Sequence, residues 1–182
     1  MLNRIRISHI ALLLVLLSVI SVSFASESHQ SGYSGQEDRK IKSLSSKDIE
    51  ALLSGAGWGL AKPAELNGIP GPLHLLELQT DLDLSDEQVT KIQAIWSSMN
   101  KKAIEEGKNY LASEEKIEAF FQTQAKDNLE LEKLLNQSSK HLAMLRKIHL
   151  SAHLEVLPTL SPHQIKKYNV LRGYQKHTNH SH

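Results

Sequence analysis

The stretch Leu84-Ser85-Asp86-Glu87-Gln88 decides how the second half of this chain folds. Ser85 is a preferred helix N-cap residue, and Gln88 three positions later can bond back to the Ser85 backbone N–H, which makes a capping box. The acidic side chains of Asp86 and Glu87 suit the positive end of a helix dipole. We therefore expect a helix to begin at this point.

The same device recurs near the C-terminal end, in Leu160-Ser161-Pro162-His163-Gln164. Ser161 takes the cap position and Gln164 bonds back. Pro162 occupies the first helical position, where its fixed φ suits the helix and its missing N–H is not needed. The two boxes are the most specific local signal in the chain, and each predicts a helix start.

The sequence between the boxes is typical of long helices. From Ser85 to Leu157 it contains one glycine, Gly107, and no proline. Because glycine is a poor helix former and Ser113 precedes acidic residues that suit a helix start, we expect two long helices with a turn region between Gly107 and Ser113.

A seam of apolar and small residues follows Asp127 in steps of three and four, as in a helix that packs on another helix. Its members are Leu131, Leu135, Ser138, Leu142, Leu145, His149, Ala152 and Val156. We expect one helix from Thr123 to Leu157, ended by Pro158. At 1.5 Å per residue this helix is roughly 50 Å long. A compact chain of this size has a radius of gyration of about 15 Å, so we expect an elongated molecule.

Glycine and proline are concentrated ahead of Pro72. Helical spacing of apolar residues covers 36–53, and the glycine-rich stretch 55–59 is expected to end that helix as a loop. A short apolar helix is expected over 73–82, directly after Pro72.

The composition limits the chemistry. The chain has 182 residues, with 21 basic residues against 20 acidic ones and no cysteine. A near-neutral chain lacks the strongly basic face that general nucleic-acid binding needs, so no nucleic-acid partner is expected. Without thiolates, a bound metal must be held by histidine, carboxylate or methionine.

The first 25 residues have the layout of a secretory signal. Arg4 and Arg6 precede an apolar run that ends in small residues before a cleavage site after Ala25. This layout predicts export by a cleaved signal, with a retained membrane anchor as the alternative.

Four histidine and carboxylate side chains are candidate metal ligands. His149 and His153 are four residues apart, so both imidazoles project from one face of a helix. His74 and Glu77 form a second pair three residues apart, which can converge with the first if their helices pack together. Such a site suits zinc, nickel, cobalt or copper, although no cofactor is required. The alternative is a structural polar cluster in which a histidine bonds Glu77.

A cluster of histidines at the C-terminus is expected to be a disordered tail rather than a built site. It consists of His177, His180 and His182.

Leu150, Leu154 and Leu157 lie beside the seam and are left without a partner by a simple pair of helices. They must be covered by a second subunit, by returning segments or by a ligand.

The sequence does not favour an enzyme. It has neither the Glu-x-x-His of a di-iron bundle nor the His-Glu-x-x-His of a zinc hydrolase. Ser34 lacks the five-residue nucleophile elbow.

The boxes LSDEQ and LSPHQ resemble the paired LTxxQ boxes of the CpxP/Spy family of periplasmic stress proteins, over roughly Pro72 to Tyr174. Zinc-responsive ZraP-like chaperones and CnrX-like metal sensors are similar relatives. The sensors have a histidine and a methionine four apart, whereas here Met144 follows His141 by three, so no sensor ligand is transferred. The resemblance implies ATP-independent binding of unfolded client proteins, or signalling through an envelope sensor protein.

Together these observations predict an elongated all-α protein with short flanking helices. The resemblance further implies that the long helices form a hooked hairpin, that the protein is a periplasmic homodimer, and that Leu150, Leu154 and Leu157 are candidate client-binding residues. We divide the chain into a signal peptide (1–25), a flexible or partly helical region (26–71), the hairpin domain (72–175) and the histidine-rich tail (176–182). The expected function is that of a chaperone or stress adaptor. The alternative is a periplasmic metal-binding, metal-sensing or resistance protein.

Overall fold

The computed structural model describes residues 31–123 and 127–175, and this part of the chain is helical with no strand. The chain divides into two compact units, Met1–Gly35 and Gln36–His182, and all elements below belong to the second. None of the described helices combines the length and apolarity needed to cross a bilayer. The signal segment and the histidine tail lie outside the described residues.

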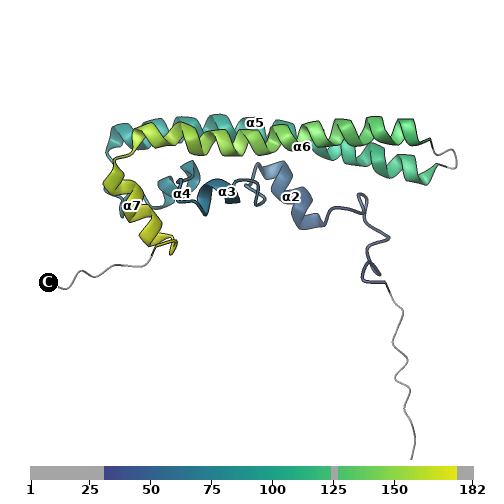
Figure 1. The fold of residues 1–182 in the computed structure, drawn as a ribbon, viewed down its shortest axis with the longest axis horizontal. Coiled ribbons are helices and arrows are strands. Elements are labelled where there is room, and N and C mark those ends of the chain that lie inside the picture. Colours follow the sequence, from purple (N-terminus) through teal and green to yellow (C-terminus); the bar gives the residue numbers. More distant parts are fainter. Residues whose placement is uncertain (1–30, 124–126, 176–182) are drawn as a thin grey trace, which may run out of the picture. The chain divides into compact units, whose positions relative to one another are not determined.

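The described part of the second unit contains six α-helices and one 3-10 turn (Figure 1). They are α2 (Ser46–Ser54), α3 (Lys62–Glu65), α4 (Pro72–Glu77), α5 (Asp86–Gln122), α6 (Asn128–Val156), η1 (Leu157–Thr159) and α7 (Pro162–Leu171). The all-α prediction is therefore confirmed for the described residues.

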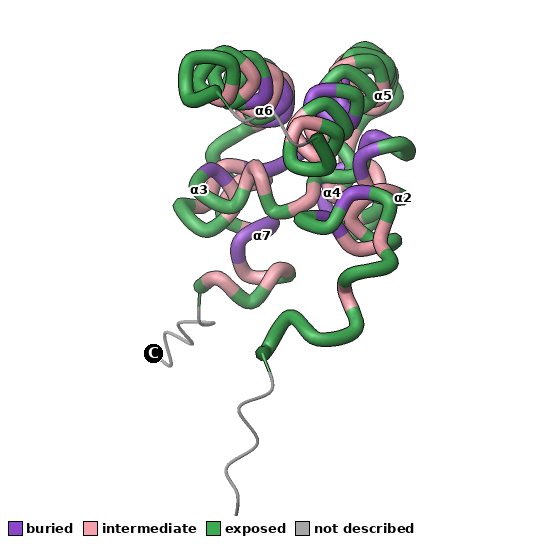
Figure 2. Tube along the Cα trace, turned by 90° about the vertical axis from the view of Figure 1, so that its right-hand side faces the viewer, coloured by how far each residue is buried: buried purple, intermediate pink, exposed green. Residues whose placement is uncertain are grey.

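The two long helices, α5 and α6, pack side by side and run in opposite directions (Figures 1 and 2). Cross-helix bonds fix this register: Glu114 on α5 bonds Ser138 on α6, and Glu106 further back on α5 bonds His141 further along α6. The predicted seam is largely buried in this contact. One member differs, since Leu135 is 47% exposed.

Helices α2, α3 and α4 lie along one side of the long pair, and α7 packs at the end where α6 finishes (Figure 1). Two apolar clusters result. One joins α2 to the middle of α5 and α6, around Leu52, Ala103 and Leu145. The other joins α4, α5 and α7 around Leu75, Ile92 and Tyr168, which is 0% exposed.

Both predicted capping boxes form, and the two boxes bind each other. Each serine hydroxyl accepts the backbone N–H of its glutamine, and each glutamine oxygen accepts the N–H of its serine. Gln88 Nε2 also donates to Gln164 Oε1 at 2.9 Å, and Gln164 Nε2 donates to Gln88 Oε1 at 3.1 Å. The remaining amide protons bond the Thr159 and Leu82 carbonyls. Every polar group of both amides is thereby used.

A third capping box, at Ser45 and Asp48, starts α2. Its signal, Leu44-Ser-Ser-Lys-Asp48, has an acid in place of glutamine and was readable from the sequence. Asp48 also accepts a bond from Trp58 Nε1 at 2.9 Å. These bonds from Ser45 and Trp58 lower the pKa of Asp48 to about 2.

The predicted turn between Gly107 and Ser113 is wrong, because α5 runs unbroken through both residues. Gly107 is a packing residue: a Cβ there would lie 2.4 Å from the Leu52 carbonyl oxygen of α2. The Ser113 hydroxyl bonds the Tyr110 carbonyl within the helix instead of capping a new one. The glycine is therefore needed for close approach of α2.

Three predicted helix bounds also change. The helix expected from Thr123 begins at Asn128, where Asp127 caps it by accepting the Leu129 N–H. The helix expected over 73–82 ends at Glu77, and the one expected over 36–53 is restricted to Ser46–Ser54.

The close approach of α2 to α5 at Gly107 can be tested by substitution. Alanine in place of an exposed helical glycine stabilises a helix by about 1 kcal/mol. Here we expect Gly107→Ala to destabilise the protein by roughly 1–3 kcal/mol, because α2 must move away from α5. Urea unfolding measures the change. Gly57→Ala is the control, since a Cβ at Gly57 meets nothing within 4 Å. A more stable Gly107→Ala protein would contradict this role.

Candidate functional site

A cavity of about 440 Å³ lies where α2, α3 and α4 meet the long helices. Its walls are the stretch from Ser54 to Gly59, Ala61 and Lys62, Glu65 of α3, Gly71 to His74, three residues of α5, and His149 and His153 of α6. Trp58 and Trp96, the chain's two tryptophans, both line it. The size and mixed lining are typical of sites that bind small ligands.

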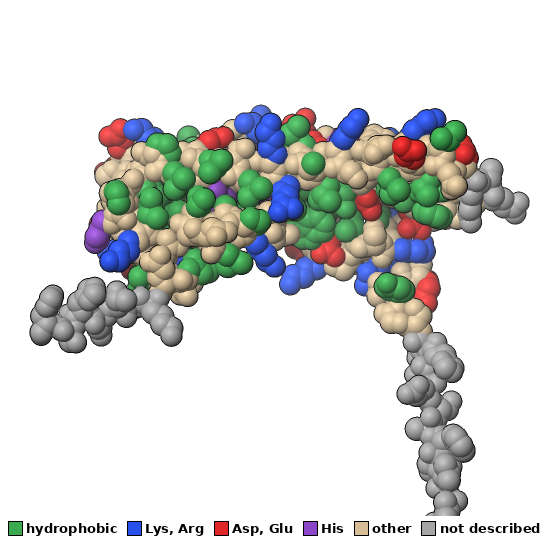
Figure 3. Space-filling model, viewed as in Figure 1, with side chains coloured by type: hydrophobic (Ala, Val, Ile, Leu, Met, Phe, Trp, Pro, Cys, Tyr) green, Lys and Arg blue, Asp and Glu red, His purple; other side chains and the backbone are tan. Residues whose placement is uncertain are grey.

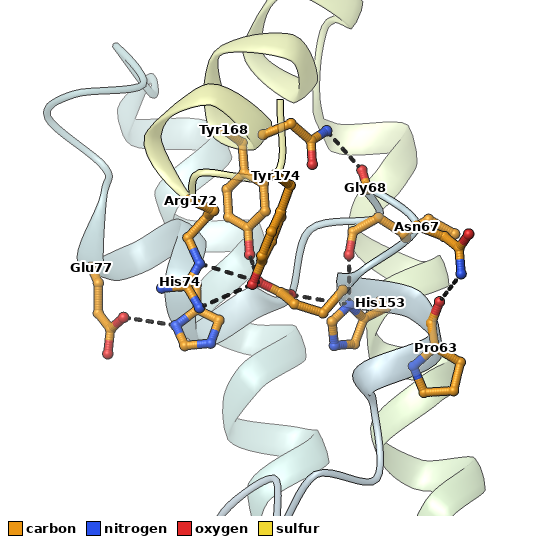
Figure 4. A network of polar contacts seen from close by, with 12 residues as sticks. Pro63, Asn67, Gly68, His74, Glu77, His153, Tyr168, Arg172 and Tyr174 are labelled. Atoms are coloured by element: carbon orange, nitrogen blue, oxygen red, sulfur yellow. Dashed lines mark hydrogen bonds and ion pairs between the residues drawn. The ribbon is translucent and has the colours of Figure 1, made fainter. Parts of the chain in front are cut away.

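Glu65 connects the cavity to α7. Its Oε1 accepts bonds from the Tyr168 hydroxyl at 2.5 Å, the Tyr174 hydroxyl at 3.1 Å and Arg172 Nε at 3.2 Å. Figure 4 shows these three side chains of the C-terminal segment converging. Burial, and then the bond to Glu65, raise the pKa of Tyr168 well above its usual value, which keeps its hydroxyl protonated as a donor.

The other oxygen of Glu65 has a different environment. Oε2 is buried and has no hydrogen-bond partner, although the side chain lines the cavity. The Nδ1 atom of His153 lies 4.0 Å away, beyond hydrogen-bond distance. A buried carboxylate oxygen without a partner is costly, so this atom is a candidate ligand-binding group.

His153 is oriented by the backbone. Its Nδ1 bonds the Ile69 carbonyl at 2.9 Å, so Nε2 is the ring nitrogen that this bond does not use (Figure 4). A Cβ on Gly71 would lie 3.0 Å from that Nε2 and 3.6 Å from Glu65 Oε2. Glycine at this position therefore leaves open the space that both atoms border.

His149 is 4% exposed, and its Nε2 is buried without a partner. Burial, and then the neighbouring His153, lower the pKa of His149 below its usual value of 6.5. The ring is therefore neutral at neutral pH, the form in which imidazole can bind a metal.

In the second predicted pair, only His74 borders the cavity, and Glu77 bonds His74 from outside it. His74 lines the cavity with His149 and His153, whereas Glu77 is not among the lining residues. Glu77 Oε2 bonds His74 Nδ1 at 2.8 Å, the structural arrangement weighed as the alternative. In the described ranges 31–123 and 127–175, no three histidine or acidic side chains are already arranged to hold a metal ion.

A second concavity, a groove of about 240 Å³, lies between α5 and α6. We call it the methionine groove, because Met99 and Met144, the chain's two methionines besides Met1, both line it. Ile148 and Ala152 complete its apolar lining. Its charged lining residues are Lys102, Lys147 and Glu155.

Two of the predicted client-binding leucines, Leu150 and Leu154, lie elsewhere on α6, and Leu157 begins η1. Leu154 is 59% exposed, while Leu150 and Leu157 are partly buried. With 3.6 residues per turn, Leu150 and Leu154 project from a different side of α6 than Met144 and Ile148. None of them lines the methionine groove.

Comparisons with family models, with curated proteins and with solved structures find no match to this chain.

The burial of His149 predicts a pH dependence of folding. In the unfolded chain this histidine titrates near its usual value of 6.5, and in the folded protein its pKa is lower. Protonation therefore favours unfolding: the stability is complete above about pH 6.5 and falls as the pH drops through the folded-state pKa.

We expect the free energy of unfolding, measured in urea at pH 7.5 and pH 5.5, to fall less in His149→Gln than in the wild type. His163→Gln, which removes an exposed imidazole, is the matched control. An equal decline in the wild type and His149→Gln would contradict the assignment.

Proposed function

We propose that this protein is an exported, ATP-independent chaperone or stress adaptor that binds apolar segments of unfolded proteins in the methionine groove. The paired boxes that resemble those of the CpxP/Spy family support this proposal. So does the character of the groove, which is the observation that carries it.

Methionine suits a surface that must accept many sequences. Its side chain is unbranched, flexible and polarizable, so it adapts to partners of different shape. Met144 is 48% exposed, and Met99 and Ile148 are partly exposed beside it. A client segment can therefore bury apolar side chains here without a unique fit.

Charged side chains around the groove support weak and reversible binding. Lys102 and Lys147 are exposed, as is Glu155, so both signs of charge are available. Figure 3 shows a similar mixture on one face of the protein, where apolar side chains lie among basic and acidic ones. Exposed charges add little affinity but steer and orient clients.

We further propose the hooked hairpin and the homodimer. The opposed packing of α5 and α6 supports the hairpin. Exposed leucines outside the groove support a second subunit, because burial of their apolar surface would stabilise a dimer. They are Leu129 and Leu135.

An aggregation assay without ATP tests client binding. We expect the protein to delay the aggregation of several chemically unfolded clients at equimolar concentration. Met144→Gln should reduce this activity several-fold, because a polar amide of similar length replaces the adaptable thioether.

Leu154→Gln is the matched control, since it makes the same polar change at an exposed position of α6 outside the groove. We expect it to retain the activity. Failure of the wild-type protein to delay any client would refute the chaperone proposal, and loss in Leu154→Gln alone would place client binding on the leucine face.

A further inference from the structure

The cavity beside α3 contains two buried polar atoms with no partner, Glu65 Oε2 and His149 Nε2. They come from helices far apart in the sequence, and neither is needed for the methionine groove. Buried polar groups in proteins are generally paired, so an unpaired carboxylate oxygen and an unpaired imidazole nitrogen in one cavity wall indicate a ligand that accepts electron pairs.

The other two histidines of the cavity are arranged as metal ligands commonly are. In metal sites the ring nitrogen that does not bind the ion is held by a carbonyl or a carboxylate, which fixes the ring. His153 Nδ1 is held by the Ile69 carbonyl at 2.9 Å. His74 Nδ1 is held by the Glu77 carboxylate at 2.8 Å. In both rings Nε2 is left to bind a ligand.

We propose that this cavity binds one zinc-type transition-metal ion through Nε2 of His149 and His153 and through Oε2 of Glu65. His74 supplies the fourth donor from α4. Three imidazoles and one carboxylate form a donor set that zinc accepts in tetrahedral geometry, with bonds of about 2.0–2.2 Å. Glu77 is a positioning residue that orients His74, and Glu65 is the carboxylate ligand.

Binding draws the side chains together. Within the described ranges no three of these groups are already close enough to share an ion. The cavity is larger than a single ion, and Gly71 adds no Cβ between His153 and Glu65. The rings can therefore move inward, and this closure changes the surroundings of Trp58 and Trp96, which line the same space.

Zinc titration of the full chain tests the proposal. To remove adventitious binding by the tail, the starting protein carries alanine at His177, His180 and His182. Calorimetry should give one zinc per chain with micromolar or tighter affinity, and tryptophan fluorescence should change in parallel, because both tryptophans lie in the cavity wall.

Variants locate the ion. We expect His149→Ala and Glu65→Gln each to weaken zinc binding at least about 10-fold, and Glu77→Gln to weaken it by about 10-fold through loss of the His74 orientation. His141→Ala is the matched control with unchanged affinity, since His141 bonds Glu106 at 2.7 Å and does not line the cavity. Circular dichroism checks that each variant is folded. If Glu65→Gln unfolds because α7 is released, His149→Ala decides the result.

Absence of both heat and fluorescence change would overturn the proposal, and so would zinc binding that is unaffected by His149→Ala. The outcome is independent of the proposed chaperone function. If aggregation suppression persists without zinc binding, only the metal-site proposal is refuted. If zinc binds without suppression, only the chaperone proposal is refuted.

Discussion

The side-chain amides of Gln88 and Gln164 bond each other at the end of the protein where α5 and α7 begin. Each amide also completes a capping box and bonds a carbonyl of the neighbouring loop, so one pair ties together two helix starts and the Leu82 and Thr159 backbones. This contact determines where α7 leaves the long helices. The position of α7 in turn places Tyr168 and Arg172 against Glu65.

Glu65 uses its two oxygens for different purposes. Oε1 is neutralised by Arg172 and holds α7 in place, while Oε2 faces the cavity without a partner. The three bonds to Oε1 offset part of the cost of burying the carboxylate, while Oε2 remains free to bind a ligand. The cavity therefore depends on the same contacts that fix the C-terminal helix, whereas the methionine groove depends only on the packing of α5 against α6.

Local patterns predicted the starts of α5 and α7 and most of the buried seam, because capping and periodicity are short-range properties. The prediction of a turn at Gly107 was wrong for a physical reason. The low helix propensity of glycine is a local cost, whereas the close packing that it allows is against the Leu52 backbone of α2, which is far away in the sequence. Spacing suggested that His74 can share a site with His149 and His153, and all three line one cavity. It could not identify Glu65 or Gly71, because short segments without periodicity bring these residues to the cavity, and only tertiary packing places them there.

The mutual bonding of the two capping boxes can be measured by a double-mutant cycle on Gln88 and Gln164. Stability is measured for the wild type, Gln88→Ala, Gln164→Ala and the double variant. We expect the double variant to lose less stability than the sum of the single losses, by about 1 kcal/mol or more, since either substitution alone breaks the shared bonds. Losses that add to within roughly 0.3–0.5 kcal/mol would show that the two amides act independently and would contradict this expectation.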